Sequence, residues 1–346
     1  MFNILFILRI DAKEKNGDDL FQAKQYKKIL EKYFSHHINI QFAHNLTNKE
    51  LKNTDWNLIQ LFNISRLDEH IFYLKNITYQ HIVMTPIVQP EYRFNFKDYI
   101  KTFIRGALKF KYIPYNSLKV KYDLLSQCLF NVYLSRSEQN YYEKYFVKLP
   151  NNILAHNGID KEKTILSKEE DSKKIDFLIV GRVEKSKNTL NTIKLMNKYF
   201  PTRKITIIGA GNKYHFTYFK KFLKECEQNS NIDYIGPKKH SEVLTLMSNA
   251  KILLNLSLKE VSPLVDLEAL AYNMKVLSTT ASFTHLTEDS CFMRVSPIDK
   301  NAIIEKINMI LKSHCNTKKE KQIQTWDETL RTYIEEIEKI INKETI

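Results

Sequence analysis

The sequence predicts an α/β protein made of two doubly wound domains, each built around a parallel sheet. Short apolar runs alternate with segments of helical periodicity, which is typical of parallel strands joined by crossover helices. The 346 residues are enough for two domains of ordinary size, each with its own buried core. A charged stretch, Asp160–Lys174, offers almost nothing to bury and is the expected connection between the two domains.

The first half begins with an apolar run, Ile4–Leu8, that ends at Arg9 and Asp11. Because no basic segment precedes it, this run is interpreted as a buried strand rather than a signal peptide. A helix follows, and its apolar side chains fall on one face: Leu20, Tyr26, Ile29, Leu30, Tyr33 and Phe34. The further strands expected in this half are Ile38–Phe42, Trp56–Phe62, His81–Met84 and Val132–Ser135.

The second half alternates more regularly. One helix is expected between each pair of the strands Phe177–Val180, Ile205–Ile208, Ile232–Ile235, Ile252–Asn255 and Lys275–Ser278. After Pro297 a helix is expected near Asn301–Leu311. A last amphipathic helix carries Trp326, Leu330, Tyr333, Ile334 and Ile337.

Composition narrows the class of protein. Lys and Arg number 53 against 39 Asp and Glu, so the formal net charge is +14. Hydrophobic residues make up 43% of the chain, which excludes a disordered or fibrous protein. The four cysteines, at positions 128, 226, 291 and 315, are too far apart for a zinc or CxxC motif. We therefore expect a reduced, cytoplasmic protein. No apolar run approaches the roughly 18 residues of a membrane span.

The glycines are few, and their positions are informative. Only 7 are present, and four of them directly follow strands of the second half: Gly181, Gly209, Gly211 and Gly236. Ligands of open parallel sheets bind outside the carboxyl ends of the strands, where small residues allow close approach. The segment Ile207–Gly211 is equally well interpreted as a tight turn between strand and helix. We therefore assign it no catalytic role.

The first chemical motif is Gly181-Arg-Val-Glu-Lys-Ser-Lys187, which follows the strand Phe177–Val180. This position brings Arg182 and Lys187 to the carboxyl edge of the sheet, where two cations can hold a diphosphate. The alternative is an ordinary solvated basic loop. A Walker motif is absent from the sequence.

The second motif runs from Leu258 to Ala271 and contains two acids. Ser262 is expected to cap a helix and Pro263 to occupy its first position, so the helix N-terminus offers N–H groups to an anion. Glu260 precedes the helix and Glu268 lies about two turns into it. One carboxylate can then reach a sugar near the phosphate, and the other a more distant hydroxyl. The alternative is a pair of unconnected surface acids.

These segments occur in the order found in a known family. The chain resembles the retaining GT-B glycosyltransferases of family four, which use nucleotide-sugar donors. Its second half is similar to the family's GRLxxxK, IVGxG, FxG, E-x7-E and AMACGxPVVAT segments, at Gly181–Lys187, Ile207–Gly211, Ile235–Gly236, Glu260–Glu268 and Ala269–Thr279. Its first half is similar to the GGD, VHLFN, LSPI and PNGVD segments, at Asn16–Asp18, Leu58–Asn63, Met84–Ile87 and His156–Asp160.

The resemblance implies two Rossmann-like domains facing across a cleft. Residues 1–160 would form the acceptor-side domain, to which 326–346 return as a terminal helix, and 161–325 would bind the donor. Arg182 and Lys187 would hold the diphosphate, Glu260 the donor sugar and Glu268 the ribose. The other donor-binding residues implied are Gly17, whose loop would close over the donor, and Gly181, Gly209, Val261, Ser262, Pro263 and Leu264.

The sequence also departs from the family pattern. Val261-Ser-Pro263 stands where the family usually has a glycine-containing loop, and Pro263 has no N–H to donate. Asn188 and Asn273 replace glycines, and Asn is a common substitute where φ is positive. No histidine base is assigned, because Thr85-Pro86 occupies the region where many members have one. Asp18-Asp19 is interpreted as helix capping rather than metal binding, so no metal or other cofactor is expected.

A strongly basic segment lies in the first half. Between Tyr92 and Lys121 eight Lys and Arg residues accompany a single acid, Asp98. A helix there would place aromatic residues on one face and expose Lys97, Lys101, Arg105 and Lys109, a shape suited to an anionic bilayer that carries lipid-linked acceptors. The alternative is an ordinary helix that packs its aromatics on the sheet.

The leading functional hypothesis is therefore a retaining, metal-independent transferase that builds a lipid-linked or cell-surface glycan, in the cytoplasm or on the inner face of the membrane. A GT-B epimerase or phosphorylase is a second hypothesis. A glycosyltransferase acting on nucleic acid or protein, or a basic nucleic-acid-binding protein, is a third, because the net charge and the aromatic residues suit phosphate and base stacking. The sequence assigns neither the nucleotide base, the sugar, the acceptor nor the oligomeric state.

Overall fold

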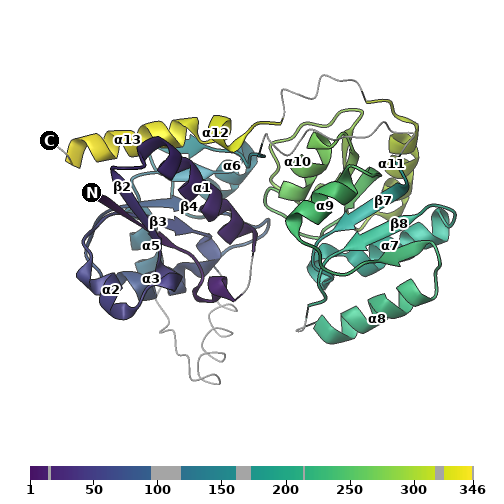
Figure 1. Cartoon of the computed structure of the whole chain (residues 1–346), viewed down its shortest axis with the longest axis horizontal. Helices are drawn as coiled ribbons and strands as arrows, with labels where there is room; N and C mark the ends of the chain where they lie inside the picture. Colours follow the sequence, from purple (N-terminus) through teal and green to yellow (C-terminus); the bar gives the residue numbers. More distant parts are fainter. Residues whose placement is uncertain (15–16, 95–117, 161–172, 213–214, 316–322, 345–346) are drawn as a thin grey trace. The chain divides into compact units, whose positions relative to one another are not determined.

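The computed structural model describes residues 1–14, 17–94, 118–160, 173–212, 215–315 and 323–344. The chain forms two compact units (Figure 1). The first consists of Met1–Asn157 together with Trp326–Ile346, and the second of Gly158–Thr325. Each unit contains a sheet of six parallel strands with helices packed on it. The predicted α/β class with two doubly wound domains is confirmed.

The first sheet has the strand order β2-β1-β3-β4-β5-β6. Its strands are β1 Phe2–Ile7, β2 Ile38–Phe42, β3 Trp56–Phe62, β4 Tyr79–Thr85, β5 Asn131–Tyr133 and β6 Asn152–Leu154. Among the described residues before Asn157, the helices of this unit are α1 Asp18–Phe34, α2 Asn48–Asn53, α3 Leu67–Leu74, α5 Leu118–Ser126 and α6 Arg136–Tyr145. The side chains that α1 buries recur at helical spacing, among them Ala23, Tyr26 and Leu30.

The C-terminal helices α12 Trp326–Thr329 and α13 Arg331–Glu344 belong to the first unit and run beside it (yellow in Figure 1). Trp326 is buried, with its ring centroid 6.4 Å from that of Phe21 on α1. The buried Tyr333 hydroxyl donates to Gln60 Oε1 on β3 at 3.0 Å. The terminal helix therefore returns to the first domain, as the family resemblance implied.

The second sheet has the order β12-β11-β10-β7-β8-β9. Its strands are β7 Ile175–Val180, β8 Ile205–Ile208, β9 Ile232–Tyr234, β10 Ala250–Asn255, β11 Lys275–Thr279 and β12 Phe292–Val295. One apolar core lies under α7 Thr189–Tyr199, α8 Phe216–Glu227 and α11 Lys300–Lys312, and the other lies under α9 His240–Met247 and α10 Leu264–Ala271. The strand order reverses between β7 and β10, so ligands are expected outside their carboxyl ends.

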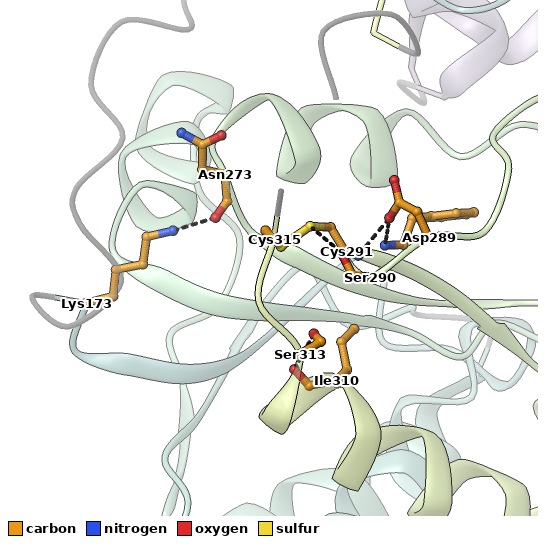
Figure 2. Close-up of a disulfide and its surroundings, with 9 residues drawn as sticks. Lys173, Asn273, Asp289, Ser290, Cys291, Ile310, Ser313 and Cys315 are labelled. Carbon is orange, nitrogen blue, oxygen red and sulfur yellow. Dashed lines mark hydrogen bonds between the residues drawn. A yellow bond between two sulfur atoms is a disulfide. The ribbon is translucent and has the colours of Figure 1, made fainter. Parts of the chain in front are cut away.

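The structure contains one disulfide, between Cys291 and Cys315 (Figure 2). Cys291 directly precedes β12, and its backbone N–H donates to Asp289 Oδ1 at 2.7 Å. Cys315 lies three residues beyond the end of α11. This pair departs from what a reduced protein would show, because folding brings together two cysteines that are 24 apart in sequence. Cys128 and Cys226 are free thiols.

Two predicted segments fall outside the described residues. These are most of the charged connection, 161–172, and most of the basic segment, including Lys97, Lys101, Arg105 and Lys109. Within the ranges that are described, none of the helices combines the length and the apolar character needed to cross a bilayer.

Candidate functional site

Three glycines at the carboxyl ends of β7, β8 and β9 allow the turns that follow these strands to pack closely and to form backbone hydrogen bonds. The Gly181 N–H donates to Ile208 O at 2.9 Å, and the Gly209 N–H donates to Gly236 O at 3.0 Å. A Cβ placed on Gly209, where φ is +149°, would lie only 1.8 Å from Gly181 O. Gly209 therefore allows two backbone turns to touch, which supports the interpretation of its segment as a tight turn. This contact fixes the start of the loop that carries Arg182 and Lys187.

The loop after β7 is organised around an acid that the sequence analysis did not single out. Glu184 is buried and accepts hydrogen bonds from Ser186 Oγ at 2.7 Å and Asn212 Nδ2 at 2.5 Å. Burial alone would raise its pKa, but these bonds and the charges of Arg182 and Lys187 outweigh burial and lower it. The Arg182 guanidinium lies 3.3 Å from Glu184, and its side chain remains 64% exposed. Glu184 thus holds the loop while Arg182 faces solvent.

Lys187 and Glu260 meet at the strand-order reversal. Lys187 ends a 3-10 turn after β7, and Glu260 lies in the loop between β10 and α10. Lys187 Nζ is 2.5 Å from Glu260 Oε1, and the side chains are 24% and 9% exposed. The backbone N–H of Glu260 donates to Ala281 O at 2.9 Å, which fixes the loop. The cation expected for phosphate and the acid expected for sugar are therefore in direct contact.

Asn188, which follows Lys187, has a φ of +57°, and Asn273 has a φ of +52°. Both stand where the family has glycine, and both adopt the left-handed conformation that Asn tolerates better than most residues. The prediction made from these two substitutions is confirmed. At Asn188 the turn directs the chain from Lys187 into α7.

The start of α10 differs in detail from the prediction. Pro263 occupies the capping position rather than the first helical position, and Leu264 begins the helix. Ser262 therefore stands one residue before the capping position that was predicted for it. Val261 O accepts a hydrogen bond from the Phe283 N–H at 2.7 Å, which ties the loop to the segment after β11. Val261, Ser262, Pro263 and Leu264 nevertheless form the segment that joins Glu260 to the helix.

Glu268, on α10, has a partner that sequence reasoning missed. His240, the first residue of α9, places Nε2 2.6 Å from Glu268 Oε1, and the two side chains are 42% and 17% exposed. The sequence offered a weak signal for this contact, because His240 lies four residues beyond Gly236 in the turn after β9. The acid expected to bind ribose is thus already oriented by an imidazole.

Asp266 is a third acid of the same segment, and it was not predicted. It is fully buried on the first turn of α10. Its Oδ1 accepts from Asn255 Nδ2 at 2.9 Å, and its Oδ2 accepts from Ser278 Oγ at 2.5 Å. Glu260, Asp266 and Glu268 therefore each contact a different element of the second unit.

Gly17 belongs to the first unit and directly precedes α1. A Cβ at this position would lie 2.7 Å from Arg9 Nη2 and 2.8 Å from Asp19 Oδ1. Arg9 also forms an ion pair with Asp19, Nε to Oδ2, at 3.2 Å. Asp18 and Asp19 lie in the first turn of the helix, where Gly17 occupies the capping position and Asp19 Oδ1 accepts from the Leu20 N–H at 2.9 Å. Gly17 thus leaves room for a buried ion pair at the carboxyl end of β1.

A separate cavity of about 560 Å³ lies between α7 and the segment that leads into α11. Its walls include Asn188, Leu256 and Leu258, which neighbour Lys187 and Glu260 in the sequence. None of the predicted donor-binding residues lines it. Gly181, Gly209, Lys187 and Glu260 lie instead in the segments that follow β7, β8 and β10, whereas Glu268 lies on α10 beside the start of α9.

Comparison with known proteins identifies what the second unit resembles. Residues 160–325, nearly the whole second unit, match the family model for glycosyl transferases group 1. The second unit is therefore similar to the group 1 glycosyltransferases. No curated protein matches the sequence.

Solved structures match the whole chain in fold. HepE of Anabaena, in complex with UDP and glucose, is similar with a TM-score of 0.68 and 13% identity over 98% of this chain and 100% of that one. Sucrose-phosphate synthase of Thermosynechococcus elongatus gives 0.67 and 14% identity over 100% and 98%. The lipopolysaccharide outer core galactosyltransferase WaaB gives 0.60 and 11% identity over 99% and 100%. The fold is therefore GT-B, as the resemblance implied.

Proposed function

We propose that this glycosyltransferase transfers a sugar, with retention of its anomeric configuration, from a nucleoside diphosphate sugar to a glycan acceptor. The observation that carries the proposal is the contact between Lys187 and Glu260, at 2.5 Å. It joins a cation suited to the leaving phosphate and an acid suited to the sugar hydroxyls at the carboxyl edge of one sheet.

The proposed roles follow from charge and exposure. The exposed Arg182 guanidinium binds the diphosphate by two parallel hydrogen bonds, and Lys187 adds a point charge. Glu260 accepts from hydroxyls of the sugar, and Glu268, oriented by His240, accepts from the ribose. The N-terminus of α10, which follows the Glu260 loop, adds its positive dipole.

Bond breaking in glycosyl transfer leaves negative charge on the departing diphosphate. Groups aimed at that charge stabilise the transition state more than the ground state and so accelerate the reaction. In the proposed reaction the bond from the sugar carbon to the phosphate oxygen breaks as the acceptor oxygen attacks the same face, and the departing phosphate takes the acceptor proton. Since Arg182, Lys187 and α10 supply the positive charge, we propose that no metal is required.

The donor and acceptor classes rest on the similar proteins. HepE was solved with UDP and glucose, which makes UDP-glucose a suitable first probe. WaaB is a lipopolysaccharide galactosyltransferase, which supports a glycan acceptor. The basic segment between Tyr92 and Lys121 suits an acceptor held on an anionic membrane. The test of this last point is cosedimentation with anionic liposomes, compared with a variant in which Lys97, Lys101 and Arg105 are changed to Glu. Equal binding by both proteins would contradict membrane contact.

The test of the main proposal is a thermal-shift screen of nucleoside diphosphates and nucleotide sugars, followed by product analysis. A ligand at 100 times its Kd stabilises the native state by about 2.7 kcal/mol. We expect a hit that weakens in Arg182→Ala and Lys187→Ala, and near-complete loss of transfer in a folded Glu260→Gln. Proton NMR of the product reports the anomeric configuration, and activity in EDTA reports metal dependence. Wild-type turnover in all three variants would refute the assigned site.

A further inference from the structure

The buried carboxyl group of Asp266 joins three elements of the second unit. Asn255 is the last residue of β10, and Ser278 is its partner in register on β11. Asp266, on α10, accepts a hydrogen bond from each, at 2.9 Å and 2.5 Å. Asn255 Oδ1 also accepts from Ser257 Oγ at 2.8 Å. One carboxyl group therefore fixes the end of β10, the end of β11 and the first turn of α10.

The position of this contact matters because of what lies between its partners. The chain leaves β10 at Asn255, passes through Glu260 and enters α10 just before Asp266. The Asn255–Asp266 bond thus closes the base of the loop that carries Glu260. We propose that Asp266 is a positioning residue of the donor site, which clamps this loop so that Glu260 stays in contact with Lys187. This inference rests on the proposed function of that pair.

The neutral partners of Asp266 and its burial also affect the pH at which its carboxyl group ionises. The two groups that bond to Asp266 are neutral, an amide and a hydroxyl. Burial raises the pKa of Asp266 to about 7, with Glu260 adding to the rise and Lys187 opposing it. Among the described residues, these are the charged groups that act on Asp266, one from the loop after β10 and one from the turn after β7. Asp266 therefore changes its charge near neutral pH.

Ionised Asp266 makes the cluster of Lys187, Glu260 and Asp266 negative by one charge, whereas protonated Asp266 leaves it neutral. A diphosphate is an anion, so it binds better to the neutral cluster. Donor affinity should then fall as the pH rises through about 7. If the donor bound only to the protonated form, a rise from pH 6 to pH 8 would weaken binding by about tenfold.

The first test measures binding of UDP-glucose by calorimetry between pH 6 and pH 8. This probe is suitable because both of its phosphates are esterified and keep their charge over that range. We expect the Kd of the wild type to rise with pH, and that of Asp266→Asn, which is permanently neutral, to stay at its low-pH value. Asp266→Ala removes the clamp and should weaken binding at every pH.

Two control variants test whether the pH dependence of donor binding comes from Asp266. Asp289→Asn alters another aspartate of the same unit that also accepts two hydrogen bonds, from the N–H groups of Cys291 and Phe292, and it should keep the wild-type pH profile. His240→Gln removes the imidazole beside Glu268 and should leave the pH dependence in place. A pH profile in Asp266→Asn equal to that of the wild type would overturn the inference.

A second measurement needs no donor and so separates this inference from the proposed function. A raised pKa means that the native state holds its proton more tightly than the unfolded chain. The stability that Asp266 contributes is then full below about pH 4 and declines as the pH rises to about 7. Chemical unfolding of the wild type should show this decline, and Asp266→Asn should lack it. Failure of UDP-glucose to bind, with this difference present, would count against the donor alone, while identical unfolding profiles would count against Asp266.

Discussion

The ammonium group of Lys187 and the carboxylate of Glu260 form one ion pair, at 2.5 Å, although the residues are 73 positions apart. Removing either partner leaves the other partly buried and uncompensated, which costs more than the pair itself contributes. We therefore expect Lys187→Met and Glu260→Gln to be non-additive, with a coupling energy of about 1–2 kcal/mol in a double-mutant cycle of unfolding free energies. Additive single changes would show that the contact contributes nothing to folding.

A substitution at Arg182 should weaken nucleotide binding without much change in the unfolding free energy. Because its side chain is 64% exposed, Arg182→Ala should change the unfolding free energy by no more than about 0.5 kcal/mol. Loss of a charged hydrogen bond to the diphosphate should weaken nucleotide binding roughly 10- to 100-fold. The matched control is Arg203→Ala, in the same unit, whose guanidinium lies 3.6 Å from Asp176. Equal affinities in the two variants would remove Arg182 from the site.

The contact between Gly209 and Gly181 predicts a severe effect of one methyl group. Gly209→Ala places a Cβ 1.8 Å from Gly181 O at a φ of +149°, so we expect a loss of about 3 kcal/mol or more. Gly236→Ala is the control: its φ is +71°, but nothing lies within 4 Å of the added atom. Left-handed strain alone should cost about 1 kcal/mol there. Comparable losses at both positions, measured by denaturant unfolding, would argue against the backbone contact.

The disulfide should make stability depend on reductant. Linking Cys291 to Cys315 closes a loop with a sequence separation of 24, which in the chain-entropy model stabilises the fold by about 3 kcal/mol. Unfolding of the wild type should therefore shift to lower denaturant when dithiothreitol is added. The Cys291→Ala, Cys315→Ala double variant should already be destabilised and insensitive to reductant. If dithiothreitol does not change the denaturant unfolding of the wild type, the disulfide does not form in solution.

The sequence predicted the architecture well where hydrophobic patterning was long and regular. β2, β3 and β8 have the expected bounds, because the apolar residues of each recur at strand spacing. The edge strands β6 and β12 were missed. β6 has only three residues, and β12 is interrupted by Arg294, so neither produces a clear periodic signal.

The site was predictable to the extent that its chemistry resides in local motifs. Arg182, Lys187, Glu260 and Glu268 were identified because strand ends and a helix start predict where they lie. Glu184, Asp266 and His240 were missed because their importance lies in contacts between distant segments, such as Asp266 with Ser278 and Glu268 with His240. The disulfide was missed for the same reason. No short-range pattern encodes such pairings.

The chain leaves the first unit after Asn157 and returns to it at Trp326, and the two connecting segments lie side by side. Ile159, at the start of the second unit, pairs with Thr325, at its end, and the Ile159 N–H donates to Gln324 O at 3.0 Å. The second unit is thus an insertion with adjacent ends. Because domains are inserted most readily where their two ends lie close together, we expect this unit to be replaceable as one segment while the first unit and its terminal helix stay folded.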